Sequence, residues 1–257
     1  MIFETHAHYD DERFEEDREE LITSMPERGV GTIINVGASI ESTKTTLALS
    51  ERYEFVYAAV GVHPSDISGL NEETFAWLKE QTKREKVVAV GEIGLDYYWD
   101  KEPEIQKQQR YWFAEQMKLA REVSLPVIIH SRDAAADTME VMKSVHAEEI
   151  PGVIHCYSYS KEMAQEFIKM GYYIGVGGVV TFKNAKKLKE TVQEIPLERI
   201  LLETDCPYMA PEPHRGGRND SSYISFVIAK IAELKGITPE EVEQVTRENA
   251  ERLFRIM

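Results

Sequence analysis

The chain has 257 residues, 42% of them hydrophobic, and its 30 Lys and Arg against 45 Asp and Glu give a formal charge of −15. The hydrophobic share excludes a disordered chain, and two cysteines are too few for a disulfide-stapled miniprotein. The excess of acid argues against a protein that coats nucleic acid with a basic face.

Short apolar runs recur along the chain, and each is followed by a polar stretch with helical spacing. Parallel strands joined by crossover helices are buried on both faces, so they read as Val- and Ile-rich runs of this kind. Eight strand–helix units predict an α/β fold, a (β/α)8 TIM barrel that forms one domain over residues 1–257. The predicted strands are residues 2–8, 31–37, 55–63, 87–95, 127–130, 153–156, 172–180 and 200–205.

The polar segments carry helix signals of their own. The first twenty residues hold nine acids and two arginines, a net charge of −7, and we expect a solvated first helix there. Pro103 opens a long helix, and Thr238 caps the last one. The first residues lack the pattern of a secretion signal, and no apolar run reaches the ~18 residues of a membrane span. We therefore expect a cytoplasmic protein with no membrane partner and no obligate protein partner.

Metal-ligating residue types gather at the carboxyl ends of the predicted strands, where a barrel of this kind places its active site. His6 and His8 are two apart on the first strand, so the strand period points both the same way. Four imidazoles and two carboxylates exceed the three protein ligands of a simple catalytic zinc site and predict two divalent ions about 3.5–4 Å apart. The predicted ligands are His6, His8, Glu92, His130, His155 and Asp205, with Glu92 as the bridge between the ions.

These donor types leave the metal open, because imidazoles favour zinc whereas phosphate chemistry often uses Mg²⁺ or Mn²⁺. Cys156 and Cys206 each follow a predicted ligand. Alternation along a strand turns both away from the ligands, so we expect them to be buried small side chains.

The same residues lie in segments that resemble the signatures of the TatD family of metal-dependent hydrolases. The segments are Thr5-His6-Ala7-His8, Gly61-Val62-His63-Pro64, Gly91-Glu92-Ile93-Gly94-Leu95-Asp96-Tyr97, Ile129-His130-Ser131-Arg132, Ile154-His155-Cys156-Tyr157-Ser158 and Leu202-Glu203-Thr204-Asp205-Cys206-Pro207-Tyr208. The resemblance spans nearly the whole chain. It implies a TIM-barrel phosphoesterase of the amidohydrolase superfamily with divalent ions and, among relatives, deoxyribonuclease activity. The family's ligand pattern falls on the six predicted ligands.

Two loop motifs of the family are also matched, at residues 177–182 and 215–219. After the second loop this chain has Asp220-Ser221, where relatives often have Glu-Pro.

The chemistry we expect is hydrolysis of a phosphodiester by a water that the two ions activate. The catalytic residues would be Glu92, Asp205, which orients or deprotonates the water, and His63, which contacts the phosphate or protonates the leaving oxygen. Glu203, on the same strand face as Asp205, would brace a ligand histidine. Candidate substrate-binding residues are Lys183, Arg215, Arg218 and Asn219, and candidate stacking aromatics are Tyr97, Tyr98, Trp99, Tyr157 and Tyr159.

The most specific prediction is a deoxyribonuclease of the 3′–5′ exonuclease type, acting on single-stranded DNA or RNA. The barrel fold and the metal ions do not determine the substrate. The alternative function is therefore that of a metal-dependent ester or amide hydrolase, acting for example on aminoacyl-tRNA or a small lactone. No lysine stands at the end of the fourth predicted strand to form a carboxylated bridge, which argues against a small-ring amidohydrolase. A non-catalytic metal-binding scaffold is the third alternative, which the full ligand set does not favour.

Charge refines the expected substrate. Outside the first twenty residues the net charge is only −8, and two divalent ions would make the active site locally positive. We therefore expect weak, metal-dependent binding of nucleic acid as single strands or ends, without a basic track for long duplex.

Overall fold

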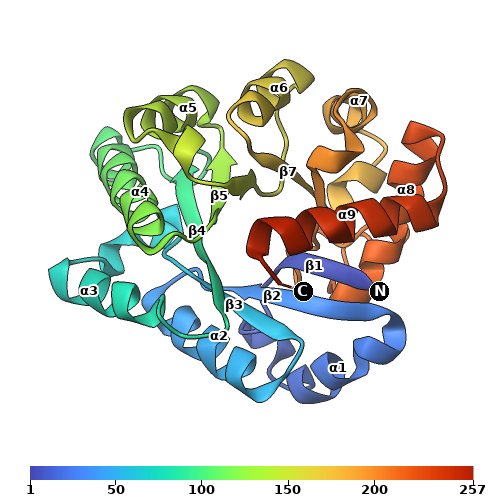
Figure 1. Cartoon of the computed structure of the whole chain (residues 1–257), viewed down its shortest axis with the longest axis horizontal. Helices are drawn as coiled ribbons and strands as arrows, with labels where there is room; N and C mark the ends of the chain where they lie inside the picture. Colours follow the sequence, from blue (N-terminus) through green and yellow to red (C-terminus); the bar gives the residue numbers. More distant parts are fainter. Residues whose placement is uncertain (257) are drawn as a thin grey trace. The chain divides into compact units, whose positions relative to one another are not determined.

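Strands and helices alternate along the chain (Figure 1). Within residues 1–256, which the computed structural model describes, the strands are β1 Ile2–Ala7, β2 Val30–Val36, β3 Val56–Val60, β4 Val87–Asp96, β5 Val127–Arg132, β6 Gly152–Ile154, β7 Tyr173–Val176 and β8 Ile200–Leu202. The α-helices are α1 Arg18–Ser24, α2 Ile40–Arg52, α3 Glu72–Gln81, α4 Pro103–Val123, α5 Ala135–Ser144, α6 Lys161–Lys169, α7 Lys186–Glu194, α8 Ile224–Lys235 and α9 Pro239–Phe254.

The strands form one sheet in the order β1 to β8. Ala7, at the end of β1, forms a parallel bridge to Cys206, beyond the end of β8. Eight parallel strands in chain order with helices between them make up the (β/α)8 barrel that the sequence predicts, so the fold class is confirmed.

Every predicted strand is present, but several end earlier than their apolar runs. β3 stops at Val60, β7 at Val176 and β8 at Leu202, so the predicted ends at 63, 180 and 205 are wrong. Beyond β7 the chain turns into a 3-10 helix, Gly178–Thr181. Asp205 has a φ of 59°, which lies in the left-handed region and not in a strand. The segments after β3 and β7 continue with glycine and valine, so hydropathy overextends these two strands, whereas the residues after β8, Glu203-Thr204-Asp205, are polar.

The chain divides into two compact units. Unit 1 comprises residues 1–35 together with the chain from Cys156 onward, and unit 2 comprises Val36–His155. Each unit has its own buried core and its own share of the predicted ligands. The expectation of one domain over residues 1–257 stays a prediction.

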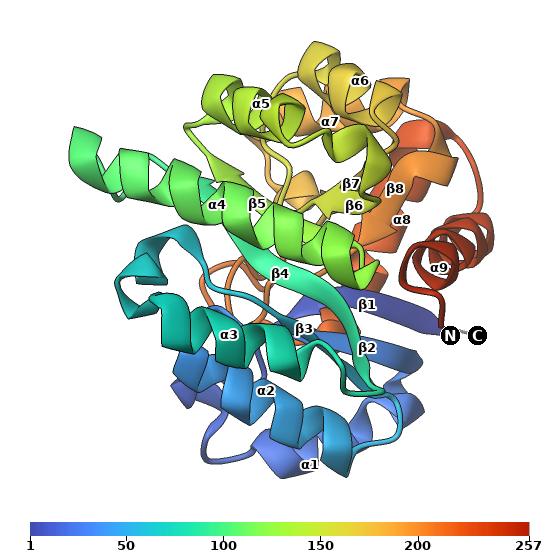
Figure 2. The same cartoon turned by 60° about the vertical axis from the view of Figure 1, so that its left-hand side comes forward.

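In unit 2, helices α2, α3 and α4 pack beside β3 and β4 (Figure 2). One part of the core joins apolar side chains from α2, α3, β3 and β4: Leu47, Ala58, Val60, Leu78 and Val87. Pro103 begins α4, as predicted. This helix also reaches the end of β4, where Gln109 Oε1 accepts a hydrogen bond from the backbone N–H of Asp96 at 3.0 Å. The carboxyl end of β4 is thereby fixed against α4.

In unit 1, the C-terminal helix α9 lies beside β1, although the two are at opposite ends of the chain (Figure 1). Phe3 of β1 and Phe254 of α9 stack with ring centroids 6.2 Å apart. Thr238 caps α9, because its hydroxyl accepts a hydrogen bond from the backbone N–H of Glu241 at 3.1 Å. The predicted cap is confirmed, and α9 holds β1 in place.

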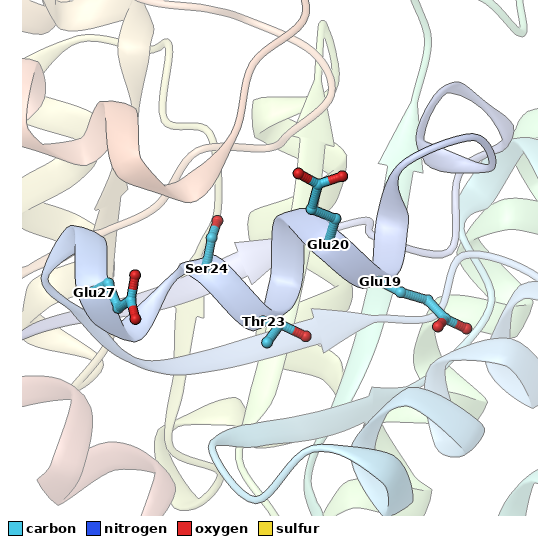
Figure 3. Close-up of a pocket in the computed structure, with 5 residues that line it drawn as sticks. All are labelled: Glu19, Glu20, Thr23, Ser24 and Glu27. Carbon is cyan, nitrogen blue, oxygen red and sulfur yellow. The ribbon is translucent and has the colours of Figure 1, made fainter.

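The acidic N-terminal segment faces water along α1, as predicted, while Leu21 and Ile22 are buried. A surface pocket on this helix and the turn after it contains no predicted site residue (Figure 3). Its lining residues are Glu19, Glu20, Thr23, Ser24 and Glu27. Three carboxylates make this pocket a poor receptor for an anionic substrate. In residues 1–256, no helix combines the length and the apolar character that a membrane span requires.

Candidate metal centres

The first group of donors, termed the His6 cluster, consists of His6, His8 and Asp205 in unit 1. The Nε2 atoms of His6 and His8 lie 3.0 Å apart, as the two-residue spacing on one strand face predicts. Asp205 Oδ1 lies 3.8 Å from His6 Nε2 and 3.4 Å from His8 Nε2. The structure thus brings three predicted ligands together.

Backbone hydrogen bonds between β1 and the segment after β8 fix this cluster. The N–H of Asp205 donates to the carbonyl of His6 at 3.0 Å, and the N–H of His8 donates to the carbonyl of Cys206 at 2.9 Å. Each ligand is therefore anchored through its own main chain to the opposite segment, so the donor atoms converge without depending on a flexible loop.

The donor geometry of the His6 cluster fits a divalent ion. Ligand atoms about 2.0–2.1 Å from a tetrahedral zinc ion are about 3.3 Å from one another. The three donor atoms here are separated by 3.0, 3.4 and 3.8 Å. Two imidazoles and one carboxylate are also a donor set that catalytic zinc sites use, with a further position left for water or substrate. The residues present therefore suit a metal ion.

A second group, termed the Glu92 cluster, consists of Glu92, His63, His130 and His155 in unit 2. The Oε1 atom of Glu92, on β4, lies 2.8 Å from His130 Nδ1, 3.5 Å from His155 Nε2 and 3.9 Å from His63 Nε2. The carboxylate is almost fully buried, and three imidazoles surround one of its oxygens. Three more predicted ligands are thus brought together, with His63 added beside them.

Asp96, which is the last residue of β4 and has no predicted role, contacts the other side of His130. Its Oδ2 lies 3.0 Å from His130 Nε2. Because both carboxylates only accept, His130 donates from Nε2 to Asp96, and in its doubly protonated form it also donates from Nδ1 to Glu92. Burial alone would lower the pKa of His130, but the hydrogen bonds to Asp96 and Glu92 outweigh it and raise that pKa. Asp96 is therefore the residue that orients the His130 ring.

His63 occupies a different position from the other imidazoles. It caps the 3-10 helix Pro64–Gly69, and its Nδ1 accepts a hydrogen bond from the backbone N–H of Ser65 at 3.2 Å. An imidazole that accepts at Nδ1 carries its proton on Nε2 when it is neutral. That Nε2 is the atom that faces Glu92. The hydrogen bond to Ser65 thus favours a proton donor at this position over a metal ligand.

Two buried glutamates support the His6 cluster. A carboxylate oxygen of Glu203 lies within 4.8 Å of an imidazole nitrogen of His6, and Glu203 Oε1 accepts from the backbone N–H of Cys156 at 2.6 Å. Glu4, missed in the sequence analysis, accepts from the backbone N–H groups of His6 and Thr204, each at 3.0 Å. Burial raises the pKa of Glu4 to about 8, against the hydrogen bonds from Thr204 and His6. Its spacing of two from His6 was the signal that could have found it.

The two cysteines behave differently from each other. Cys206 is buried, as predicted, and burial raises the pKa of its thiol well above the usual value. The expectation that Cys156 turns away from the ligands is wrong, since its Sγ lies within 4.8 Å of a carboxylate oxygen of Asp205. Cys156 lies beyond the end of β6 with a φ of 46°, so strand alternation does not apply to it.

The loop residues predicted to bind substrate differ in exposure and in their contacts. Lys183 and Arg215 are exposed, with the Arg215 guanidinium 4.3 Å from the ring centroid of Phe182. Arg218 forms a two-pronged ion pair with Asp17. Asn219 is buried and donates through Nδ2 to the carbonyls of Thr204 and Tyr208 at 3.0 and 2.7 Å. The substrate contacts of all four stay predictions.

The five candidate aromatics fall into two groups. Tyr97 and Tyr157 form hydrogen bonds within the protein. The Tyr97 hydroxyl donates to Asp137 Oδ2 at 2.7 Å, and the Tyr157 hydroxyl donates to the carbonyl of Ser160 at 2.5 Å. Tyr159 is half-buried, against the edge of the Tyr157 ring. Tyr98 and Trp99 are exposed.

A (β/α)8 barrel with imidazole and carboxylate donors gathered where its strands end defines a metal-dependent hydrolase. The model of the family described as TatD related DNase matches residues 3–255. The chain therefore belongs to the TatD family, as its motifs indicated.

Relatives and solved structures agree with this membership. The protein described as uncharacterized metal-dependent hydrolase YabD of Bacillus subtilis is 49% identical to this chain, over 100% of both. The crystal structure of YjjV, a TatD homologue from Escherichia coli, has 34% sequence identity and a TM-score of 0.93, covering 100% of this chain and 98% of that one. A TatD-family hydrolase from Entamoeba histolytica shares the fold at 22% identity, with a TM-score of 0.87 over 99% of this chain and 98% of that one.

Proposed function

We propose that this chain is a divalent-metal-dependent phosphodiester hydrolase, a deoxyribonuclease that removes nucleotides from the 3′ end of single strands. The observation that supports it is the pair of donor clusters, each with the residue types and spacings of a metal site. In this proposal the His6 cluster and the Glu92 cluster each hold one ion. Zinc, magnesium or manganese bound there would acidify a water and neutralise charge on the phosphate.

In this proposal, residues in and around these clusters transfer the protons, position the ligands and bind the phosphates. Asp205 is 19% exposed at its side chain, so its carboxylate can take a proton from a water that comes from solvent. His63 holds a proton at Nε2, set by the Ser65 hydrogen bond at Nδ1, and gives it to the leaving oxygen. Glu92 fixes the rings of His130 and His155. Lys183 and Arg215 supply positive charge to the phosphates of the strand.

The test is a cleavage assay on single-stranded DNA labelled at its 3′ or its 5′ end, with Mg²⁺, Mn²⁺ or Zn²⁺ added separately. Loss of a 3′ label as single nucleotides is the expected result. Asp205→Asn and Glu92→Gln should each slow cleavage by about 10²–10⁴-fold. The first removes the carboxylate that accepts the proton of the water, and the second removes the negative charge of the carboxylate at the centre of the Glu92 cluster.

The matched control is Glu20→Gln, which removes an exposed carboxylate on α1 outside both clusters and should cleave like the unaltered protein (Figure 3). Equal cleavage by Asp205→Asn and the unaltered protein would mean that the activity comes from a contaminant. Turnover of lactones or charged tRNA without cleavage of DNA would establish the rival ester hydrolase instead.

A further inference from the structure

Two aromatic side chains project into solvent directly after β4, the strand that carries Glu92. Trp99 is 67% exposed and Tyr98 is 43% exposed, whereas other large aromatic side chains such as Tyr9, Phe14, Phe113 and Phe167 are fully buried. Exposed aromatic surface held in one place is characteristic of a binding site. Because these rings follow the strand that carries Glu92, a ligand with a flat apolar face would suit them.

The two rings are held in a fixed arrangement with a cation. Their centroids are 4.8 Å apart at an interplanar angle of 86°, so Tyr98 and Trp99 meet edge to face. The guanidinium of Arg132 lies 4.0 Å from the centroid of Tyr98 and 5.6 Å from that of Trp99. Cation–π contacts of this kind fix the rings before a ligand arrives, which reduces the entropy lost on binding. We call Tyr98, Trp99 and Arg132 the aromatic platform.

A single carboxylate links the aromatic platform to the Glu92 cluster. Asp96 Oδ1 accepts from the backbone N–H groups of Tyr98 and Trp99 at 2.9 and 3.0 Å, while its Oδ2 faces His130 Nε2 at 3.0 Å. Asp96 and Arg132 are also partners in the pairing of β4 with β5. The platform and His130 thus share one anchor at the carboxyl ends of two adjacent strands, and a ligand on the rings would lie beside the cluster.

We infer that the aromatic platform binds an unpaired base of the nucleic-acid substrate, next to the phosphate that is cleaved. This inference rests on the function proposed above. The rings would stack on the base, and the guanidinium of Arg132 would face the neighbouring phosphate, a combination of groups that single-strand binders use. A base paired in a duplex hides its faces in the stack, so the platform also selects single strands or frayed ends.

The experiment compares oligothymidylate with a strand of the same length whose last three nucleotides are abasic. Stacking on one base contributes about 5- to 150-fold in affinity, so Trp99→Ala should raise KM for oligothymidylate within that range. The same variant should leave KM for the abasic strand unchanged, because that strand has no base to stack. Tyr111→Ala, which removes a 57%-exposed ring on α4, is the matched control and should change neither KM.

A second measurement is independent of cleavage. Stacking should quench the fluorescence of Trp99 when oligothymidylate is added and not when the abasic strand is added. Trp99→Phe keeps a flat ring, so it should retain the KM of the unaltered protein while the quenching disappears. This separates stacking from a merely structural role of the side chain.

The outcomes distinguish this inference from the function on which it rests. Cleavage by the unaltered protein with the same KM in Trp99→Ala, or equal quenching by both strands, would overturn the platform alone. No cleavage of either strand, together with quenching by oligothymidylate only, would overturn the nuclease and support the platform.

Discussion

His130 has a carboxylate at each ring nitrogen, and the two carboxylates contact it in different ways. Glu92 faces Nδ1 at 2.8 Å, and Asp96 faces Nε2 at 3.0 Å. A histidine that binds a metal through one nitrogen commonly donates from the other to a carboxylate, which fixes the ring and raises its basicity. Asp96 occupies the position of that partner. Burial would raise its pKa, but the hydrogen bonds from His130 and from the backbone N–H of Trp99, with the charges of His130 and His63, together lower it.

Replacing Asp96 by Asn tests this positioning role. The amide retains an oxygen for the backbone N–H groups of Tyr98 and Trp99, but it presents N–H to His130 Nε2, which would drive the ring proton to Nδ1. We expect metal affinity to fall about 10–100-fold. Competition of the purified protein with a metal-sensitive chelating dye measures it.

Asp137→Asn is the matched control, since Asp137 is a half-exposed carboxylate of the same unit that bonds to Tyr97 and Arg110. It should leave metal affinity unchanged. Equal affinity of Asp96→Asn and the unaltered protein would show that His130 does not need Asp96 to bind.

Among the secondary-structure elements, β7 carries a glycine at the point where the carboxylate of Glu203, just after β8, packs against it. Gly175 lies on β7, and a Cβ there would overlap with Oε2 of Glu203. That carboxylate holds the N–H of Cys156, the residue that directly follows His155. The glycine is therefore required by the close approach of a side chain rather than by its backbone angles.

Gly175→Ala should consequently destabilise the protein by about 1–3 kcal/mol through overpacking. The midpoint of urea unfolding measures this loss. Gly69→Ala, at an exposed glycine with open space around it, should change the midpoint little. If Glu203 is the obstacle, the double variant Gly175→Ala with Glu203→Ala will lose less than the two single variants together. Strict additivity would contradict the steric explanation.

The sequence predicts the existence of these elements better than their ends. Val-rich runs identify β4 and β5 because strands covered by helices must be apolar throughout. The run at β7 misplaces the end of that strand, since Val179 and Val180 continue it, and nothing in the residue types after β8 marks the φ of 59° at Asp205. For the site, spacing on β1 brought His6 and His8 together. The contact of Asp96 with His130 depends on the register between β4 and β5, which only the structure supplies.

Over the whole chain, the charge of −15 is unevenly distributed, since nine acids lie in the first twenty residues. Glu12, Glu15, Glu16, Glu19 and Glu20 among them face water, whereas Glu4 is buried on β1. The positive groups that remain for a nucleic acid are few. Arg218 is paired closely with Asp17, whereas Arg215 lies 4.0 Å from Glu212, so the more accessible cations among the predicted contacts are Lys183 and Arg215, with Arg132 on the aromatic platform. Under the proposed function, affinity for a strand would then come mainly from bound ions and stacking.

This distribution predicts a weak dependence of binding on salt. Each phosphate neutralised on a single strand contributes about −0.7 to the slope of log K against log salt, so three cations give a slope no steeper than about −2. Fluorescence anisotropy of labelled oligothymidylate, measured from 50 to 300 mM salt with the divalent ion held constant, would give the slope. Duplex of equal length should bind more weakly at every salt concentration. A slope near −5, or tight duplex binding after chelation of the metal, would reveal a basic surface that the charges of this chain do not provide.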